Sequence, residues 1–440
     1  MILFKSLVLT LLLITFGHGR ELSLKEALEL ALKNNRELKA FHREIEALKL
    51  EREAARGAIF PRLKIEEMFL KSDLPVNVFS FKLNQEKFTP DDFNIKRLNN
   101  PPGRANFETR FTIELPIWLG GKLQAQARQA YYFLRASEYH YHRKEEEVLW
   151  RVAQAYLWAL LSKESIEVAK SSIREAEEHL RIAKARFEAG MALLADVQRA
   201  EVYLAKAKES FERAKNYYSL AKRNLELEVG MSLGEFEVKA LDKPETLSFD
   251  EIKNLALQRR KDLKAVEEEI KAQREKYRIV LSENLPQISA FATYSLNHRD
   301  YPMGSSGSGY IVGLGLTWSF DLGLATIRKA QAELERTSGL EIKYRFLKDV
   351  ILFELERAYK EYEIALYNLQ SAEQRVKASE EVVRIIKLRY QNGLARMLDL
   401  LDAQTQLDLA RFERVEAIKN LHLSRFQVLL AGGVLREFHL

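Results

Sequence analysis

The chain has 440 residues, of which 47% are apolar and 30% are charged, so it is neither a disordered segment nor a bundle of membrane helices. Its 69 basic and 63 acidic residues are interspersed and leave a net charge of only +6, which gives no indication of nucleic-acid binding. The absence of cysteine excludes disulfides, thiolate metal sites and cysteine nucleophiles.

The N-terminal residues have the pattern of a secretory signal peptide. Lys5 supplies the positive charge, residues 7–16 form an apolar run, and Gly17 and Gly19 are small residues before a cleavage point. A run of about ten apolar residues is too short to span a bilayer as a helix. We therefore expect a signal peptide at residues 1–19; the alternative is a short buried helix. No later stretch has the apolar length of a transmembrane helix.

A helix is expected from about Leu24 to Gly57, ahead of Pro61. Ser23 and Glu26 have the spacing of a capping box at its start. After this helix the apolar period changes to two, in segments of about ten residues typical of β-strands. These alternating segments are residues 62–66, 110–117, 287–296 and 312–320.

The length and alternation of these segments suit the strands of an outer-membrane barrel, with lipid on one side and water on the other. The alternative is two hairpins of a soluble sheet, and the pattern alone does not separate the two. Residues 71–106 and 297–309 between the strands are rich in turn-forming residues. We expect them to be loops.

Two long helices are expected where apolar residues follow a spacing of three and four. The first runs from Gly121 to Phe187, and the second contains the stretch from Leu355 to Val376. Sustained heptads of this kind indicate coiled coils. At about 1.5 Å per residue, a helix of about 67 residues would be about 100 Å long.

The chain repeats itself. The segment that begins at Arg186 aligns without a gap with the segment that begins at Arg389, and the match continues to Gly230 and Gly433. Each copy is expected to form a helix, a glycine turn and a second helix. An earlier segment, residues 23–61, similarly matches residues 248–286. We therefore expect a first structural repeat at residues 20–230, an irregular equatorial insert at 231–247 and a second repeat at 248–440.

This order of elements resembles that of the TolC-like outer-membrane efflux proteins, or outer membrane factors. The phrases at residues 24–35, 115–122 and 389–403 carry the same resemblance. It implies a mixed α+β membrane protein: a homotrimer in which four strands per chain form a twelve-stranded β-barrel that continues into a helical periplasmic tunnel. Independently of the resemblance, four strands are too few to close a membrane barrel, so the pattern itself requires oligomerisation.

The resemblance also implies a function. It suggests a passive efflux or secretion duct in the bacterial outer membrane that extends into the periplasm. The expected partners are outer-membrane lipid, an inner-membrane pump and a periplasmic adaptor, or membrane fusion protein. The alternative is a structural or adhesive envelope protein with coiled-coil stalks. A polar strand face lining a pore and conductance in bilayers would favour the duct over this alternative.

Two aspartates are candidates for a channel constriction. Asp399 and Asp402 lie three residues apart after the Gly393 turn, on one face of the following helix. In the family, aspartates at the matching positions ring the closed periplasmic end, and a trimer would place six carboxylates there. Arg396 could pair with one of them. The alternative is simple stabilisation of the helix N-terminus.

The two copies differ at this point, because Arg199 stands where the second copy has Asp402. The turns themselves are candidates for adaptor docking, since a glycine at a hairpin end allows close approach by another hairpin. The residues assigned to these docking tips are Arg186, Gly190, Ala192, Asp196, Arg389, Gly393 and Ala395.

Nothing in the sequence indicates catalysis. There is no phosphate-binding loop and no nucleophile motif, and His140 and His142 are two apart on a helix, so they point in different directions. We expect no enzymatic activity, no cofactor and no metal site.

Overall fold

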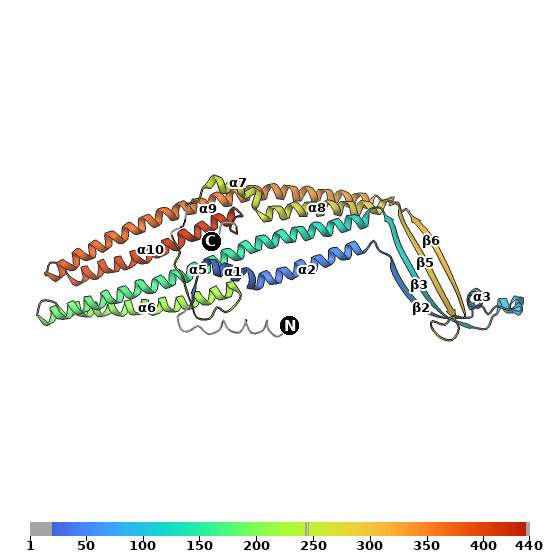
Figure 1. Cartoon of the computed structure of the whole chain (residues 1–440), viewed down its shortest axis with the longest axis horizontal. Coiled ribbons are helices and arrows are strands. Elements are labelled where there is room, and N and C mark those ends of the chain that lie inside the picture. Colours follow the sequence, from blue (N-terminus) through green and yellow to red (C-terminus); the bar gives the residue numbers. More distant parts are fainter. Residues whose placement is uncertain (1–19, 243, 245, 437–440) are drawn as a thin grey trace, which may run out of the picture. The chain divides into compact units, whose positions relative to one another are not determined.

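The computed structural model describes residues 20–242, 244 and 246–436, so the signal peptide expected at residues 1–19 lies outside the described residues. The chain forms two compact units, and each is built from both halves of the sequence (Figure 1). Unit 1 comprises Met1–Arg43, Tyr139–Lys264 and Arg345–Leu440; unit 2 comprises Glu44–Glu138 and Ala265–Tyr344.

The described residues contain ten α-helices, two short 3-10 helices and six strands. The α-helices are α1 (Leu24–Asn34), α2 (Arg36–Gly57), α3 (Pro75–Asn84), α4 (Ile95–Asn99), α5 (Lys122–Glu188), α6 (Leu194–Val229), α7 (Phe249–Arg259), α8 (Lys261–Leu281), α9 (Ala325–Gln391) and α10 (Met397–Ala431). The 3-10 helices are η1 (Pro90–Phe93) and η2 (Ser282–Asn284). The strands are β1 (Arg20–Leu22), β2 (Arg62–Ser72), β3 (Arg104–Leu119), β4 (Phe236–Val238), β5 (Gln287–His298) and β6 (Gly307–Thr317).

Unit 2 contains an antiparallel sheet with the strand order β2-β3-β5-β6. The register places like residues in rows across it. One row aligns Leu63, Ile113, Ala292 and Val312. In a neighbouring row, the hydroxyls of Thr112 and Thr293 lie 3.1 Å apart. Because side chains alternate across a strand, the sheet has an apolar face and a polar face.

The apolar face of this sheet is exposed in the single chain. On β6, the side chains of Tyr310, Val312, Leu314 and Leu316 are all at least 65% exposed. The sheet is also open, since β2 and β6 are its edges. An exposed apolar surface of this kind marks an interaction with lipid or with another chain.

Pro116 lies within β3 and cannot donate to the ladder. The register of β3 against β5 shifts between Pro116 and Trp118, so the strand accommodates the proline with a bulge. The first loop is more ordered than its turn-rich sequence indicates, because α3, η1 and α4 lie within residues 71–106. Asp92 holds this loop together by accepting hydrogen bonds from Lys82 and Thr89, and these lower the pKa of its carboxyl to about 2.

The expectation of one continuous helix from Leu24 to Gly57 was wrong, and the matching segment of the second half is divided in the same way. A break at Asn35 separates α1 from α2, and a break at Arg260 separates α7 from α8. Asn35 caps the new helix, since its Oδ1 accepts from the backbone N–H groups of Glu37 and Leu38 at 2.9 and 3.1 Å. Its Nδ2 donates to the carbonyl of Glu228 at 2.7 Å.

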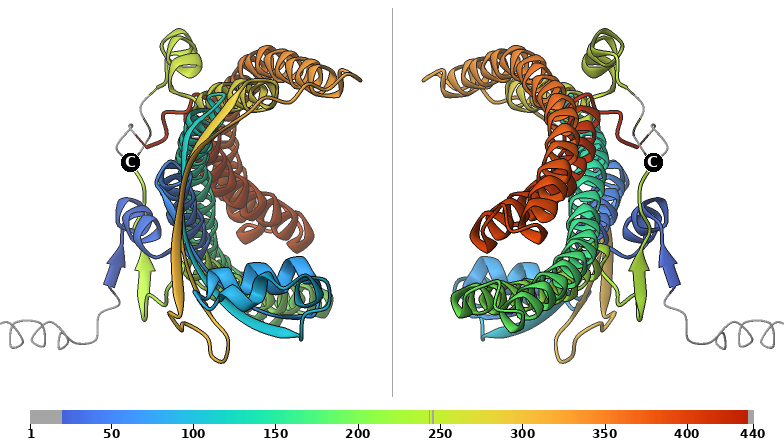
Figure 2. Two further views of the ribbon diagram at one scale, coloured as in Figure 1. Left: turned by 90° about the vertical axis from the view of Figure 1, so that its right-hand side faces the viewer. Right: turned by 90° about the vertical axis from the view of Figure 1, so that its left-hand side faces the viewer.

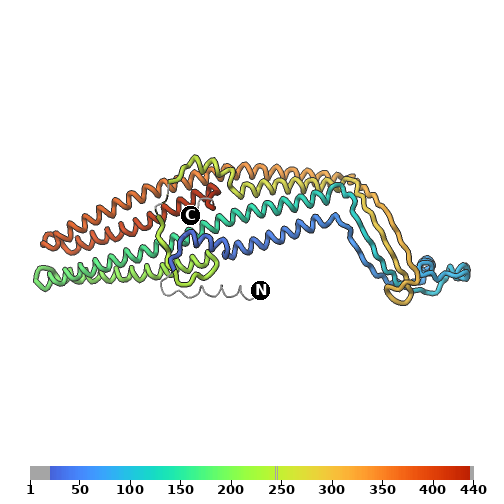
Figure 3. The backbone as a smooth tube through the Cα atoms, viewed as in Figure 1, coloured from blue at the N-terminus to red at the C-terminus, as the bar shows by residue number. Residues whose placement is uncertain are grey.

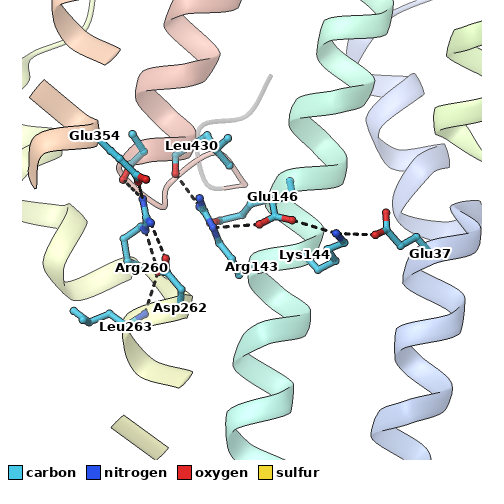
Figure 4. A network of polar contacts seen from close by, with 11 residues as sticks. Glu37, Arg143, Lys144, Glu146, Arg260, Asp262, Leu263, Glu354 and Leu430 are labelled. Carbon is cyan, nitrogen blue, oxygen red and sulfur yellow. Dashed lines mark hydrogen bonds and ion pairs between the residues drawn. The ribbon is translucent and has the colours of Figure 1, made fainter. Parts of the chain in front are cut away.

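Arg260 makes the corresponding contact in the other half of the chain. Its guanidinium donates to the carbonyl of Ala431 at 3.0 Å, and it also binds Asp262 and Glu354 (Figure 4). Nearby, Arg143 joins the buried carboxylate of Glu146 to the carbonyl of Leu430. These contacts satisfy carbonyls that the end of α10 leaves without a helical partner.

Unit 1 also contains a feature that the sequence did not indicate. The insert at residues 231–247 was expected to be irregular, but its strand β4 pairs in parallel with β1. The fully buried Tyr156 of α5 joins this pair, because its hydroxyl donates to the carbonyls of Leu22 and Lys239 at 2.8 and 2.7 Å. The same burial raises the pKa of the Tyr156 hydroxyl to about 12.

Most of the rest of unit 1 is two long helical hairpins, formed by α6 and α10 with the C-terminal parts of α5 and α9. Their turns lie at the same end of the unit (Figures 1 and 3), and the right-hand view of Figure 2 faces them. Both α5 and α9 contain 67 residues, as the heptad pattern predicted. Among the described helices, none combines the length and the apolar character needed to cross a membrane.

Candidate functional site

The two hairpin turns have the same backbone geometry. Gly190 and Gly393 occupy the left-handed region, with φ values of 69° and 77°. In the first turn the N–H of Met191 donates to the carbonyl of Arg186 at 2.8 Å; in the second, Leu394 donates to Arg389 at 2.8 Å. In each turn the glycine N–H also donates to the carbonyl three residues earlier, Gly190 to Phe187 at 2.9 Å and Gly393 to Tyr390 at 3.0 Å. This is the Schellman motif, which requires glycine or a residue that tolerates a positive φ.

We call residues 186–199 the first tip and residues 389–402 the second tip. In each, an aspartate three residues into the second helix accepts a hydrogen bond from the backbone N–H before the helix. Asp399 accepts from Arg396 at 2.9 Å, and Asp196 accepts from Leu193 at 3.4 Å. These contacts are half of a capping box and help to start α10 and α6.

The structure brings Arg396 and Asp399 together. The Arg396 guanidinium donates to Asp399 at 2.9 and 3.3 Å, and this hydrogen bond lowers the pKa of the Asp399 carboxyl. Asp402 lies on the exposed side of α10, and the described part of the chain provides no hydrogen-bond partner for it. In the first tip, Arg199 pairs instead with Asp196 at 3.5 Å. At equivalent positions, the second tip therefore carries the carboxylate of Asp402 and the first tip carries the guanidinium of Arg199.

Arg186 connects the two tips. Its Nη1 donates to the carbonyls of Tyr390 and Gln391 at 2.6 and 2.8 Å, and its guanidinium carbon lies 5.0 Å from the centre of the Tyr390 ring. Both carbonyls belong to the last turn of α9, where a cation is favoured by the helix dipole. The sequence identified Arg186 as a tip residue but gave no sign of this contact between hairpins.

Behind the tips, the hairpins share an apolar core. Ala395 and the aliphatic residues Leu180 and Ile386 pack against it. Its buried members are Ile182, Ala183, Val197, Ala200, Tyr390, Met397, Leu400 and Leu401. The core fixes one hairpin against the other, so the tip residues of the two hairpins form a single surface.

A buried polar cluster lies next to this core and was missed by the sequence analysis. Gln404 of α10 accepts from Nε2 of His179 at 3.2 Å and donates to the carboxylates of Glu175 and Asp408. Arg411 completes the cluster with two hydrogen bonds to Glu175, at 2.9 and 3.1 Å. Burial lowers the pKa of the His179 ring, so it is neutral here. The signal for this cluster in the sequence is that polar residues such as Gln404 stand where the heptad spacing of the helix calls for apolar ones.

Each tip also exposes an apolar side chain directly after its glycine. Met191 is 65% exposed and Leu394 is 69% exposed, and they occupy equivalent places in the two turns. From the sequence, the neighbouring Ala192 and Ala395 were predicted to be docking residues, and Met191 and Leu394 were not. A large apolar side chain in an exposed turn is a reasonable docking feature.

The described residues contain no cluster of histidine, aspartate and glutamate side chains that could hold a metal ion. The chemistry of this region is therefore that of charge, hydrogen bonding and apolar contact.

A model of one known protein family matches most of the chain. The family model described as outer membrane efflux protein matches residues 27–230 and 252–433. The chain belongs to the outer membrane efflux protein family. It is an outer-membrane efflux or secretion channel that extends into the periplasm. Members of this family are channels rather than enzymes.

Individual relatives of this efflux protein are distant in sequence but match it along most of their length. The alkaline protease secretion protein AprF of Pseudomonas aeruginosa is 23% identical over 446 residues, which cover 95% of this chain and 84% of AprF. The Campylobacter jejuni CmeC outer membrane channel superposes with a TM-score of 0.79 at 17% identity, covering 94% of this chain and 86% of CmeC. The outer-membrane channel OprN gives a TM-score of 0.77 at 18% identity, covering 93% and 89%.

Proposed function

We propose that three copies of this efflux protein close a twelve-stranded barrel in the outer membrane. The observation that carries this proposal is the sheet of unit 2, which has an exposed apolar face and two open edges, β2 and β6. In lipid, an open strand edge leaves backbone groups without hydrogen-bond partners, so a membrane sheet must close. Pairing β2 of one copy with β6 of the next would close it and leave the polar face inside.

The helices would continue the barrel as a tunnel built from two structural repeats per chain. The repeats proposed are residues 20–230 and 248–440, with the insert 231–247 between them. Matching contacts support this division. Gly230 and Gly433 both have a positive φ and both approach the backbone at a helix break, near Asn35 and Arg260 respectively.

The channel would act as a passive duct. Its cargo would arrive from an inner-membrane pump through a periplasmic adaptor, in keeping with the family and with a relative named for protease secretion. The family match favours this duct over the alternative of a structural or adhesive envelope protein. No cofactor or catalytic step is required.

The adaptor would dock at the two tips. Gly190 and Gly393 leave the turns without side-chain bulk, and Met191 and Leu394 offer apolar contacts beside them. Replacing either glycine with tryptophan should abolish export while trimers still form. The matched control is alanine at the same position, which has the same unfavourable φ but little bulk. Normal export in both tryptophan variants would refute docking at the tips.

The second tip would also form the channel constriction. In the assembled channel, Asp399, Asp402 and Arg396 of each copy would surround the axis at the periplasmic end. Carboxylate rings favour cations in pores. The unpaired Asp402 would then be the main source of cation preference, because Asp399 already holds Arg396.

The proposal is tested by mass and by conductance. The protein should extract from the outer membrane in detergent as a trimer and form cation-preferring pores in planar bilayers. A monomeric mass in detergent, or the absence of conductance from assembled trimers, would overturn it.

A further inference from the structure

The second tip contains an arginine, Arg389, that is equivalent to Arg186 but lacks the contact with a helix end that Arg186 makes. In the repeat, Arg389 corresponds to Arg186. Arg186 is partly buried against α9, whereas Arg389 is exposed, and within the described residues its guanidinium has no hydrogen-bond acceptor. The same functional group is therefore engaged in one copy of the repeat and unengaged in the other.

The acceptor side shows the reverse asymmetry. Arg186 binds the last turn of α9, where the Tyr390 side chain is only 3% exposed. The residue equivalent to Tyr390 is Phe187, in the last turn of α5, and it is 43% exposed. Its neighbour Glu188, which corresponds to the acceptor Gln391, is also exposed. The end of α5 therefore offers an exposed aromatic ring and two carbonyls that no side chain of the described residues contacts. The Phe187 carbonyl accepts from the N–H of Gly190, but the equivalent Tyr390 carbonyl accepts from Gly393 and from Arg186 together, so a second donor can be accommodated.

The apolar residues around these positions follow the same rule. Ile182 of α5 and Met397 of α10 are 8% and 0% exposed in the core between the hairpins. Their equivalents, Ile385 and Leu194, are 43% and 54% exposed. Ile182, Met397 and Tyr390 are thus buried while their equivalents are exposed, whereas Val197 and Leu400, which are equivalent to each other, are both buried in the core.

We infer that Arg389 of one copy clamps the end of α5 in the next copy, donating to the carbonyls of Phe187 and Glu188 and lying over the Phe187 ring. The inference rests on the proposed assembly into a ring. The donor lies on one hairpin and the acceptor on the other, so the contact is head-to-tail and can close around an axis. A guanidinium suits this position because it can donate to two carbonyls at once and stack on an aromatic ring.

This contact would make the junction between copies equivalent to the junction within a copy. Every hairpin would then donate one arginine to the hairpin beside it and receive one from the hairpin on its other side. Arg389 would hold the ring closed laterally, and the exposed Met191 and Leu394 would remain available to an adaptor.

The absence of cysteine in the chain allows a direct test by cross-linking. In the Arg389→Cys, Glu188→Cys variant, a short bis-maleimide should join copies and give covalent dimers and trimers on denaturing gels. The Arg186→Cys, Gln391→Cys variant should link only within a chain. Arg384→Cys with Glu188→Cys is the control, since Arg384 is an exposed residue of α9 that pairs with Glu381 of its own helix.

The outcomes separate this inference from the proposed function. Covalent trimers from the Arg389 pair and none from the Arg384 pair would support the clamp. The clamp would be overturned if the protein is trimeric by mass but the Arg389→Cys, Glu188→Cys variant gives no covalent dimers or trimers. Covalent dimers or trimers from the Arg186→Cys, Gln391→Cys variant would also overturn it, and both results would leave the proposed channel intact. A monomeric mass for the unmodified chain would instead overturn the proposed assembly itself.

A second measurement tests whether the contact holds the tip closed. Arg389→Ala trimers in planar bilayers should be open about tenfold more often than the parent, since losing a hydrogen bond from a charged group changes an equilibrium by at least about that factor. Arg389→Lys should recover only part of the closure, because lysine keeps the charge but not the forked geometry. Gating of Arg389→Ala equal to that of Arg384→Ala would refute the clamp.

Discussion

The charges of the second tip lead to a graded prediction for ion selectivity. The three groups proposed to surround the axis, Asp399, Asp402 and Arg396, sum to −1 per chain, or −3 for the proposed trimer. Arg389 of the same tip is not counted, because the inferred clamp holds it laterally against the next copy. Replacing Asp402 with asparagine would bring this to zero. Replacing both aspartates would leave Arg396 uncompensated and reverse it to +3.

The size of the effect follows from Coulomb's law. Three charges acting in water at about 8 Å change the local cation concentration about tenfold in dilute salt. At physiological ionic strength 8 Å is about one Debye length, and the factor falls to about threefold. We therefore expect cation preference in the parent, little preference in Asp402→Asn and anion preference in the double variant, with all differences reduced by salt.

The assay is the reversal potential of single trimers in planar bilayers under a salt gradient, measured at low and at physiological ionic strength. The control is Glu209→Gln with Glu212→Gln, which removes two carboxylates from the exposed surface of α6 away from the tips. Trimer mass should be unchanged throughout, because these carboxylates are exposed and not part of the apolar core. If the double variant keeps the selectivity of the parent, the constriction lies elsewhere.

Three further outcomes are expected. Gly230→Ala should lower the free energy of unfolding by at least about 3 kcal/mol, because φ is +87° and a Cβ would lie 2.6 Å from the carbonyl oxygen of Asn34. Gly190→Ala, where φ is +69° but the surrounding space is open, should lower it by only about 1–2 kcal/mol; thermal melts of both variants would test this. Burial lowers the pKa of His422 to about 4, so on acidification His422 is protonated in the unfolded chain before it is protonated in the folded chain. The free energy of unfolding should therefore fall as the pH drops from about 6.5 towards 4, by up to about 3 kcal/mol per chain. In thermal melts across this pH range, the His422→Leu variant should not show this fall. Gln404→Glu should put a third carboxylate beside Glu175 and Asp408 and raise the open fraction in bilayers, and an unchanged open fraction would show that this cluster does not hold the tip shut.

The elements that the sequence predicted well are those with a strong periodic signal. Strands β5 and β6 alternate over most of their length, although in β2 the alternation covers only residues 62–66 of Arg62–Ser72. Heptad spacing in α5 and in the stretch from Leu355 to Val376 of α9 was sufficient to predict long helices. Strands β1 and β4 contain only 3 residues each, which is too short to show a period. Their pairing depends on long-range contacts, including the hydroxyl of Tyr156.

The helix breaks were missed for a related reason. The apolar pattern continues across Asn35 and Arg260, and the break is stabilised by bonds to the distant carbonyls of Glu228 and Ala431. The spacing of Asp399 and Asp402 was visible because both lie on one helix. The contact of Arg186 with α9 was not, because sequence spacing reports neighbours along a helix and not between hairpins.

The identical Schellman turns of the two tips have a consequence for recognition. Their shape is determined by backbone hydrogen bonds and one glycine each, so it does not depend on the side chains that differ between the tips, such as Arg199 and Asp402. In a ring of three chains, a partner protein that recognises the backbone shape of the turns would find six equivalent sites. An ion attracted by the carboxylate of Asp402 would find only three. A single assembly can thus present a sixfold surface to a protein and a threefold field to a solute.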